Sequence, residues 1–84
     1  MPPMWEWLDT ALKDAGYDRS QYVMGFIAPN GKVITARFLT KPVYIYVGYR
    51  EPAPWRAGMT LLCIRPRSKD DMAHALGVLR EEGL

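Results

Sequence analysis

Few side chains in this sequence are of the types that catalysis or metal binding requires. The only histidine is His74 and the only cysteine is Cys63. A zinc site needs more ligands of suitable type and spacing than this pair provides. Cys63 lies in a predicted strand with no neighbouring base, so we predict a small buried apolar residue rather than a nucleophile. We therefore expect no catalytic residue, no metal ligand and no cofactor site.

The acidic side chains do not change this expectation. The pairs Asp70-Asp71 and Glu81-Glu82 lie at the two ends of a predicted helix, where charged residues are common. The sequence contains no phosphate-binding P-loop, no GxGxxG dinucleotide motif and no serine-centred elbow. A binding protein without enzymatic activity is the class that remains.

Length and composition are typical of one small folded domain, which we place at residues 1–84. Apolar residues make up 49% of the 84 and charged residues 24%, as in ordinary soluble proteins. No apolar run approaches the roughly 18 residues that cross a bilayer. Residues 1–6 lack the basic and apolar regions of a secretory signal. With a single cysteine, we expect a cytoplasmic protein that has no contact with membranes.

Charge is unevenly distributed along the chain, although the net charge is only +2. Residues 32–67 carry seven basic side chains against one acid, Glu51, whereas the segments before and after are mildly acidic. Such asymmetry concerns the choice of partner rather than the fold. The basic middle segment is consistent with nucleic acid as a possible partner.

Residues 43–49 are β-branched or aromatic at every position except Gly48, which predicts a central strand. Around it we predict a helix over residues 3–15, strands over 22–28, 33–39 and 60–65, and a helix that begins after Ser68 and ends at Gly83. Ser68 is the expected N-cap, with Asp71 in the reciprocal position of a capping box. The predicted fold is α+β: a four-stranded antiparallel sheet with the N- and C-terminal helices on one face.

Asn30-Gly31 predicts the tight turn of a β-hairpin, because both residues tolerate the positive φ angles of a type I′ turn. With these two as the loop, Phe26 faces Thr35, and Leu39 then faces Tyr44 across the next turn. Alternation of side chains assigns residues to two faces of the sheet. The first, expected under the helices, comprises Val23, Gly25, Ile27, Ile34, Ala36, Phe38, Val43, Ile45, Val47 and Tyr49.

The second face is unusual because it is largely apolar yet carries arginines. It comprises Tyr22, Met24, Phe26, Ala28, Val33, Thr35, Arg37, Leu39, Tyr44, Tyr46, Gly48 and Arg50. Monomers rarely leave a large apolar patch in water, and tyrosine, phenylalanine and arginine are enriched in interfaces. The predicted partner-binding residues are Tyr22, Phe26, Arg37, Tyr44, Tyr46, Arg50, Trp55 and Arg56.

Three interpretations of the second face stay open. In the first, the protein is an adaptor or inhibitor of a larger assembly, and the face binds a protein partner or a second copy in a homodimer. In the second, the tyrosines stack on single-stranded nucleic acid while the arginines hold phosphates. In the third, the proline-bearing connection 51–59 folds back so that Trp55 covers the face. The pairing position of the fourth strand is also left open.

Overall fold

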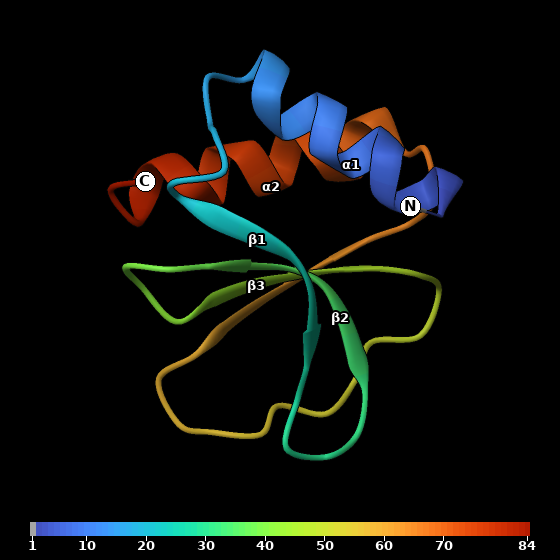
Figure 1. Ribbon diagram of the computed structural model, residues 1–84, viewed down its shortest axis with the longest axis vertical. Coiled ribbons are helices and arrows are strands. Elements are labelled where there is room, and N and C mark those ends of the chain that lie inside the picture. Colours follow the sequence, from blue (N-terminus) through green and yellow to red (C-terminus); the bar gives the residue numbers. More distant parts are fainter. Residues whose placement is uncertain (1) are drawn as a thin grey trace.

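Two helices lie together on one side of a four-stranded sheet in the computed structural model, which describes residues 2–84 (Figure 1). The order of elements is the predicted α-β-β-β-β-α. Their bounds are α1 Pro3–Asp14, β1 Tyr22–Ile27, β2 Val33–Phe38, β3 Val43–Val47, β4 Thr60–Ile64 and α2 Lys69–Glu81. The α+β class with terminal helices is therefore confirmed.

The sheet is mixed, so the prediction of a wholly antiparallel sheet is wrong. Its strand order is β1-β2-β3-β4, with β1–β2 and β2–β3 antiparallel and β3–β4 parallel. Parallel neighbours need a crossover of about a dozen residues, and residues 48–59, named here the covering loop, supply it. The short loops elsewhere in the sheet join antiparallel strands.

The turn between β1 and β2 differs from the predicted type I′ turn. The N–H of Gly31 donates to the carbonyl of Ala28 at 2.9 Å, so Pro29 and Asn30 are the central turn residues. Gly31 follows with φ +84°, and Ala28 N–H bonds to the carbonyl of Lys32. This is a three-residue loop with its glycine in the left-handed region. Proline sets φ near −65°, which suits the first central position of a type I turn.

The longer loop shifts the register by one residue, pairing Phe26 with Ile34 rather than Thr35. A one-residue shift moves side chains to the opposite face. Tyr22 accordingly pairs with Phe38 and lies in the main core beneath the helices, not on the second face. The predicted face of Tyr22 is therefore wrong.

An irregularity at Gly25 reverses the alternation again. Gly25 has φ +78°, and the described ladder of β1 and β2 has no pair between Gly25 and Thr35. The Thr35 hydroxyl accepts the backbone N–H of Val47 at 3.0 Å, which turns this point of β2 towards β3. Beyond it, Phe26 and Ile34 pack with Tyr44 instead of joining the main core. Phe26 therefore lies on its predicted face, because the one-residue register shift and the irregularity at Gly25 cancel for this residue.

The β2–β3 register also differs from the prediction, since Arg37 rather than Leu39 lies opposite Tyr44. The difference is two residues, so the relative faces of these strands are preserved. Ala36, Phe38, Val43, Ile45 and Val47 are all buried in the main core, as predicted.

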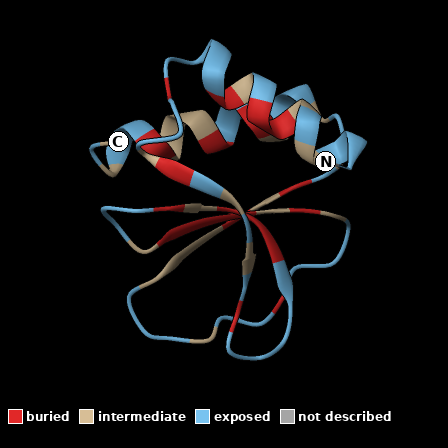
Figure 2. Cartoon of the chain, viewed as in Figure 1, coloured by how far each residue is buried: buried red, intermediate tan, exposed pale blue. Residues whose placement is uncertain are grey.

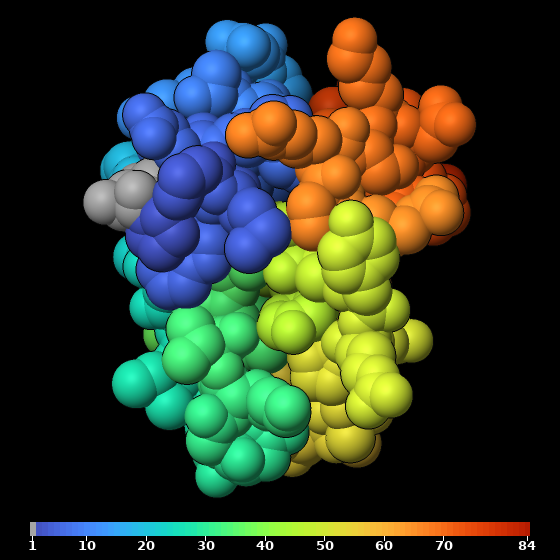
Figure 3. Space-filling view, turned by 90° about the vertical axis from the view of Figure 1, so that its right-hand side faces the viewer, coloured from blue at the N-terminus to red at the C-terminus, as the bar shows by residue number. Residues whose placement is uncertain are grey.

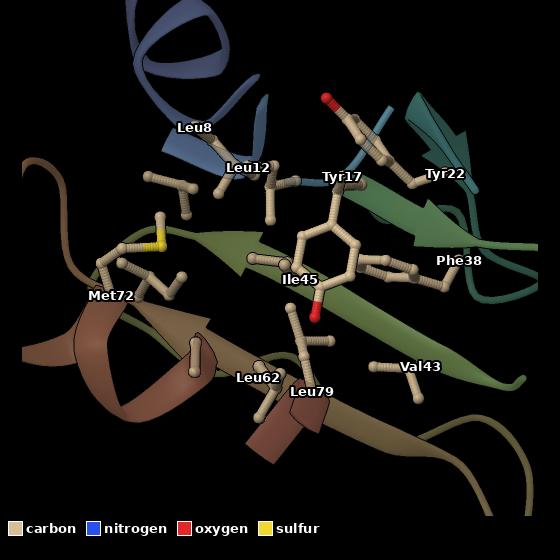
Figure 4. Close-up of a cluster of buried hydrophobic side chains, with 14 residues drawn as sticks. Leu8, Leu12, Tyr17, Tyr22, Phe38, Val43, Ile45, Leu62, Met72 and Leu79 are labelled. Atoms are coloured by element: carbon tan, nitrogen blue, oxygen red, sulfur yellow. The ribbon is translucent and has the colours of Figure 1, made fainter. Parts of the chain in front are cut away.

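The main core fills the space between the helices and the sheet. Leu8 and Leu12 of α1 and Met72 and Leu79 of α2 converge on Ile45 in the centre of β3 (Figure 4). Buried residues concentrate in this layer, whereas the loops at the far end of the sheet are mostly exposed (Figure 2). Several residues predicted for the first face lie outside the core and are exposed; these are Val23, Ile27 and Tyr49.

The start of α2 confirms the predicted N-cap but not the reciprocal bond. The Ser68 hydroxyl accepts the backbone N–H of Asp71 at 3.1 Å. The Asp71 carboxylate, however, accepts the backbone N–H of Arg65 at 2.9 Å and pairs with its guanidinium. Asp71 therefore joins α2 to the end of β4 rather than closing a capping box.

Candidate functional site

An aromatic cluster of Phe26, Tyr44 and Trp55 occupies the second face, the side of the sheet opposite the helices. Ring centroids are 5.4 Å apart for Phe26 and Tyr44, 6.0 Å for Phe26 and Trp55, and 4.8 Å for Tyr44 and Trp55. The last pair meets edge to face, an arrangement that aromatic quadrupoles favour. Trp55 comes from the covering loop, so the loop closes over the sheet.

Tyr44 is only 4% exposed beneath this loop. The structure therefore has the covered form of the second face, the third interpretation left open by the sequence. Tyr44 is therefore not accessible on the surface of the molecule. Figure 3 shows the covering loop, coloured yellow-green to yellow, packed beside the green β1–β2 hairpin below the helices.

Several contacts hold the covering loop in place. Pro52 is buried, and the backbone N–H of Trp55 donates to the sulfur of Met59 at 3.4 Å. The side-chain amide of Asn30 reaches the carbonyl of Ala53 at 3.5 Å, which links the loop to the hairpin turn. The Trp55–Met59 bond lies within the loop, and the Asn30 contact joins the loop to the β1–β2 turn.

Tyr46 lies at the edge of the cluster and is half-buried. Its ring rests against Gly48, where an added Cβ would come within 2.6 Å of a ring carbon. Glycine at this position allows the ring to lie flat on the chain as the covering loop begins. The neighbouring Tyr49, which the sequence placed on the first face, is 81% exposed.

Of the three arginines of the predicted site, Arg37 contacts the aromatic cluster directly. The Arg37 guanidinium stands over the Phe26 ring, 5.2 Å from its centroid, in a cation–π contact. Arg56 follows Trp55 in the covering loop and is exposed, as is Arg50 at the start of the loop. Within residues 2–84, neither Arg37 nor Arg56 forms an ion pair. Their positive charges are therefore available to a ligand.

Arg37 and Arg56 line one groove, called here the arginine groove, beside the β2–β3 turn. Its lining residues are Arg37, Phe38, Leu39, Thr40, Lys41, Pro42, Tyr44 and Arg56. None of these is acidic. The Lys41 ammonium donates to the carbonyl of Glu82 and so ties the turn to the end of α2. A carbonyl does not neutralise the ammonium, so a ligand in the groove would meet the charge of Lys41 as well as that of the two arginines.

The predicted site residues thus separate into two groups. Tyr22 lies in the main core, away from the rest, while the cluster brings Phe26, Tyr44, Tyr46 and Trp55 together. The sequence did not single out the β2–β3 turn as part of a site. Leu39, which the sequence placed on the second face but not among the partner-binding residues, is 44% exposed and lines the groove.

A buried polar network surrounds Tyr22 and was not predicted. The Tyr22 hydroxyl donates to the Asp9 carboxylate at 2.6 Å, and Arg19 binds both oxygens of that carboxylate at 3.1 Å. The guanidinium of Arg19 lowers the pKa of Asp9 well below its usual range, although burial opposes this. Burial, followed by the bond to Asp9, raises the pKa of Tyr22 to about 12. These groups join α1 to the start of β1.

The other titratable candidates have ordinary structural surroundings. Burial raises the pKa of the Cys63 thiol to about 11, with a smaller contribution from Glu51, so the reactive thiolate is suppressed at neutral pH. His74 is exposed on α2. No group of three or more potential metal ligands occurs among residues 2–84. Neither helix, over the same residues, has the length and apolarity required to span a bilayer.

Comparisons of the chain with protein-family models, curated proteins and solved structures find no match.

Proposed function

We propose that this protein is a non-enzymatic interaction module that binds an acidic segment of a protein partner in the arginine groove. The observation that supports this most directly is the pair Arg37 and Arg56, which line one concave surface and have no ion-pair partner within residues 2–84. Arginine is enriched in protein interfaces, and its planar fork matches carboxylates. A role as adaptor or inhibitor in a cytoplasmic assembly is the setting that we propose.

Apolar side chains beside the groove favour a protein segment as the ligand. Leu39 lines the groove and is 44% exposed, and Val23, which pairs with Arg37 across β1 and β2, is 36% exposed. A peptide with acidic and apolar residues would neutralise the arginines and cover these side chains. The predicted contact residues Phe26, Tyr44 and Trp55 then act mainly by holding the arginines in place.

Single-stranded nucleic acid is the second candidate, since unpaired arginines also attract phosphates. Stacking on bases, however, requires an aromatic face that a base can reach. Tyr44 is buried beneath Trp55, so stacking there would require the covering loop to move. This cost ranks nucleic acid below a protein segment.

Selection from a random peptide library tests the proposal. We expect the full chain to enrich peptides that combine acidic and apolar residues, and the double variant Arg37→Glu/Arg56→Glu to bind none of them. Lys32→Glu, an exposed charge reversal outside the groove, is the matched control and should retain binding. Circular dichroism of each variant excludes unfolding as the cause.

A parallel titration measures fluorescence anisotropy of labelled single-stranded DNA and RNA across a salt series. We expect no binding at low micromolar protein in low salt, where electrostatic attraction is strongest. Binding that weakens with salt by a slope of about −0.7 per phosphate contact would instead establish the nucleic-acid function. Enrichment of peptides without acidic residues, or binding that survives the double charge reversal, would contradict the proposed site.

A further inference from the structure

We infer that the anionic group recognised by the arginine groove is a phosphate monoester on a side chain of the partner. This inference rests on the proposed function and specifies its ligand. The basis is that the groove is lined by three basic side chains, those of Arg37, Lys41 and Arg56, and by no acidic one, and that neither arginine has an ion-pair partner within residues 2–84.

Arg37 is positioned before any ligand binds. Its guanidinium lies 5.2 Å from the centroid of Phe26, and that ring packs between Tyr44 and Trp55. The residue is half-buried, so its side chain has less conformational freedom than an arginine in solvent. Ordering a long side chain on binding costs about 0.5–1.5 kcal/mol, and packing against the cluster reduces this cost. The aromatic cluster thus preorganises one donor group.

Arg56 approaches the same groove from the covering loop. Its neighbour Trp55 packs edge to face on Tyr44 at 4.8 Å, and Tyr44 is the cross-strand partner of Arg37. The aromatic cluster therefore positions the backbone from which each of the two arginine side chains extends. Arg37 on β2 and Arg56 on the covering loop thus line the same groove from two segments of the chain.

Charge separates a phosphate from a carboxylate as the ligand. One carboxylate carries a single negative charge, whereas a phosphate monoester carries about −1.5 to −2 at pH 7 and offers three acceptor oxygens. The charge of one phosphate monoester therefore matches that of two arginines, and its oxygens are acceptors of the kind that a guanidinium binds in a fork. Thr40 also lines the groove and has a hydroxyl that can donate to a third oxygen.

The test uses three peptides that differ at one position, which is phosphoserine, serine or glutamate, with acidic and apolar flanking residues. Binding to the full chain is followed by two-dimensional ¹H–¹⁵N NMR. We expect shift changes centred on residues 37–44 and 56, and affinity at least about tenfold higher for the phosphoserine peptide than for glutamate, as charge-assisted bonds to a second arginine require.

Substitutions then locate the contact. Arg37→Gln and Arg56→Gln should each weaken phosphoserine binding by about tenfold or more, the value of one charge-assisted contact. Arg37→Lys should also weaken it, because lysine keeps the charge but loses the fork. Lys32→Gln removes one charge outside the groove and should have little effect. Because Arg56 is exposed in a loop, Arg56→Gln should not perturb the packing of the fold. Its effect on binding can therefore be interpreted even if Arg37→Gln disturbs the aromatic cluster.

The pH dependence provides a second readout. Affinity for the phosphoserine peptide should fall as pH is lowered through about 6, where the phosphate gains a proton, while glutamate binding stays nearly constant there. Equal affinity for phosphoserine and glutamate would overturn this inference and leave the proposed function standing. Absence of binding by all three peptides would count against both. Phosphoserine binding that is unchanged in Arg37→Gln and Arg56→Gln would also overturn the phosphate site.

Discussion

Replacing Trp55 by alanine tests whether the covering loop is packed onto the sheet in solution. Replacing a fully buried tryptophan by alanine lowers the free energy of unfolding by about 3–5 kcal/mol. Trp55 is half-buried, and it makes two aromatic contacts of roughly 0.5–1.5 kcal/mol each beyond its buried area. We therefore expect Trp55→Ala to lower the free energy of unfolding by about 2–3 kcal/mol, slightly below the fully buried range.

Urea titration and thermal melting measure this loss directly. For a domain of this size, 1 kcal/mol corresponds to about 4–8 °C in Tm, so the Tm should fall by more than about 8 °C. Tyr49→Ala is the matched control, because Tyr49 is an aromatic residue of the same loop and is 81% exposed. Its effect should stay within about 0.5 kcal/mol. Equal melting temperatures for Trp55→Ala and Tyr49→Ala would refute the packed loop.

Two further predictions concern the helix-covered side of the sheet. Asp9→Asn should destabilise the fold by about 2–3 kcal/mol at pH 7 in urea titration, because Tyr22 and Arg19 lose a charged partner. Because the pKa of Asp9 is lowered in the folded state, its carboxylate stabilises the fold fully above about pH 4, and this stabilisation is lost as the pH falls further. The free energy of unfolding of Asp9→Asn should therefore decrease less in acid than that of the unsubstituted protein. The same pH dependence for both proteins would contradict this prediction. Gly25→Ala should destabilise the fold by about 1–3 kcal/mol, because φ at this residue is +78° and the new Cβ would lie 2.9 Å from the Trp5 ring. The control is Gly77→Ala on α2, where the added Cβ meets open space and should stabilise the fold slightly. Equal melting temperatures for the two variants would refute the strain at Gly25.

Local signals were sufficient to predict the elements themselves. The run of β-branched and aromatic residues over 43–49 marked β3, and Ser68 marked the start of α2. These features depend on residues adjacent in sequence, which is why they could be predicted. The β2 and β3 residues of the main core were also assigned to the correct face, because the error in their register was an even number of residues.

The wrong predictions concern strand register and strand pairing, where a single residue can change which residues face each other across the sheet. Proline at position 29 favoured a three-residue loop over the two-residue turn, and this moved Tyr22 into the main core. Gly25 then reversed the alternation, which strand periodicity alone does not reveal. The parallel pairing of β4 depends on a crossover over residues 48–59. From the sequence, only residues 51–59 were recognisable as a connection that could fold back over the second face, and the position of the fourth strand stayed open.

The parallel pairing of β3 and β4 also explains why the aromatic face is covered. A crossover between parallel neighbours must pass over one face of the sheet, and the two helices already occupy the other. The covering loop therefore has to cross the second face, where its tryptophan packs with Phe26 and Tyr44. An apolar second face is thus required by the topology. The topology does not require Arg37 and Arg56, which line a groove beside that cluster and have no ion-pair partner among the residues that the structure describes. The arginine groove is therefore the part of this face that folding alone does not explain.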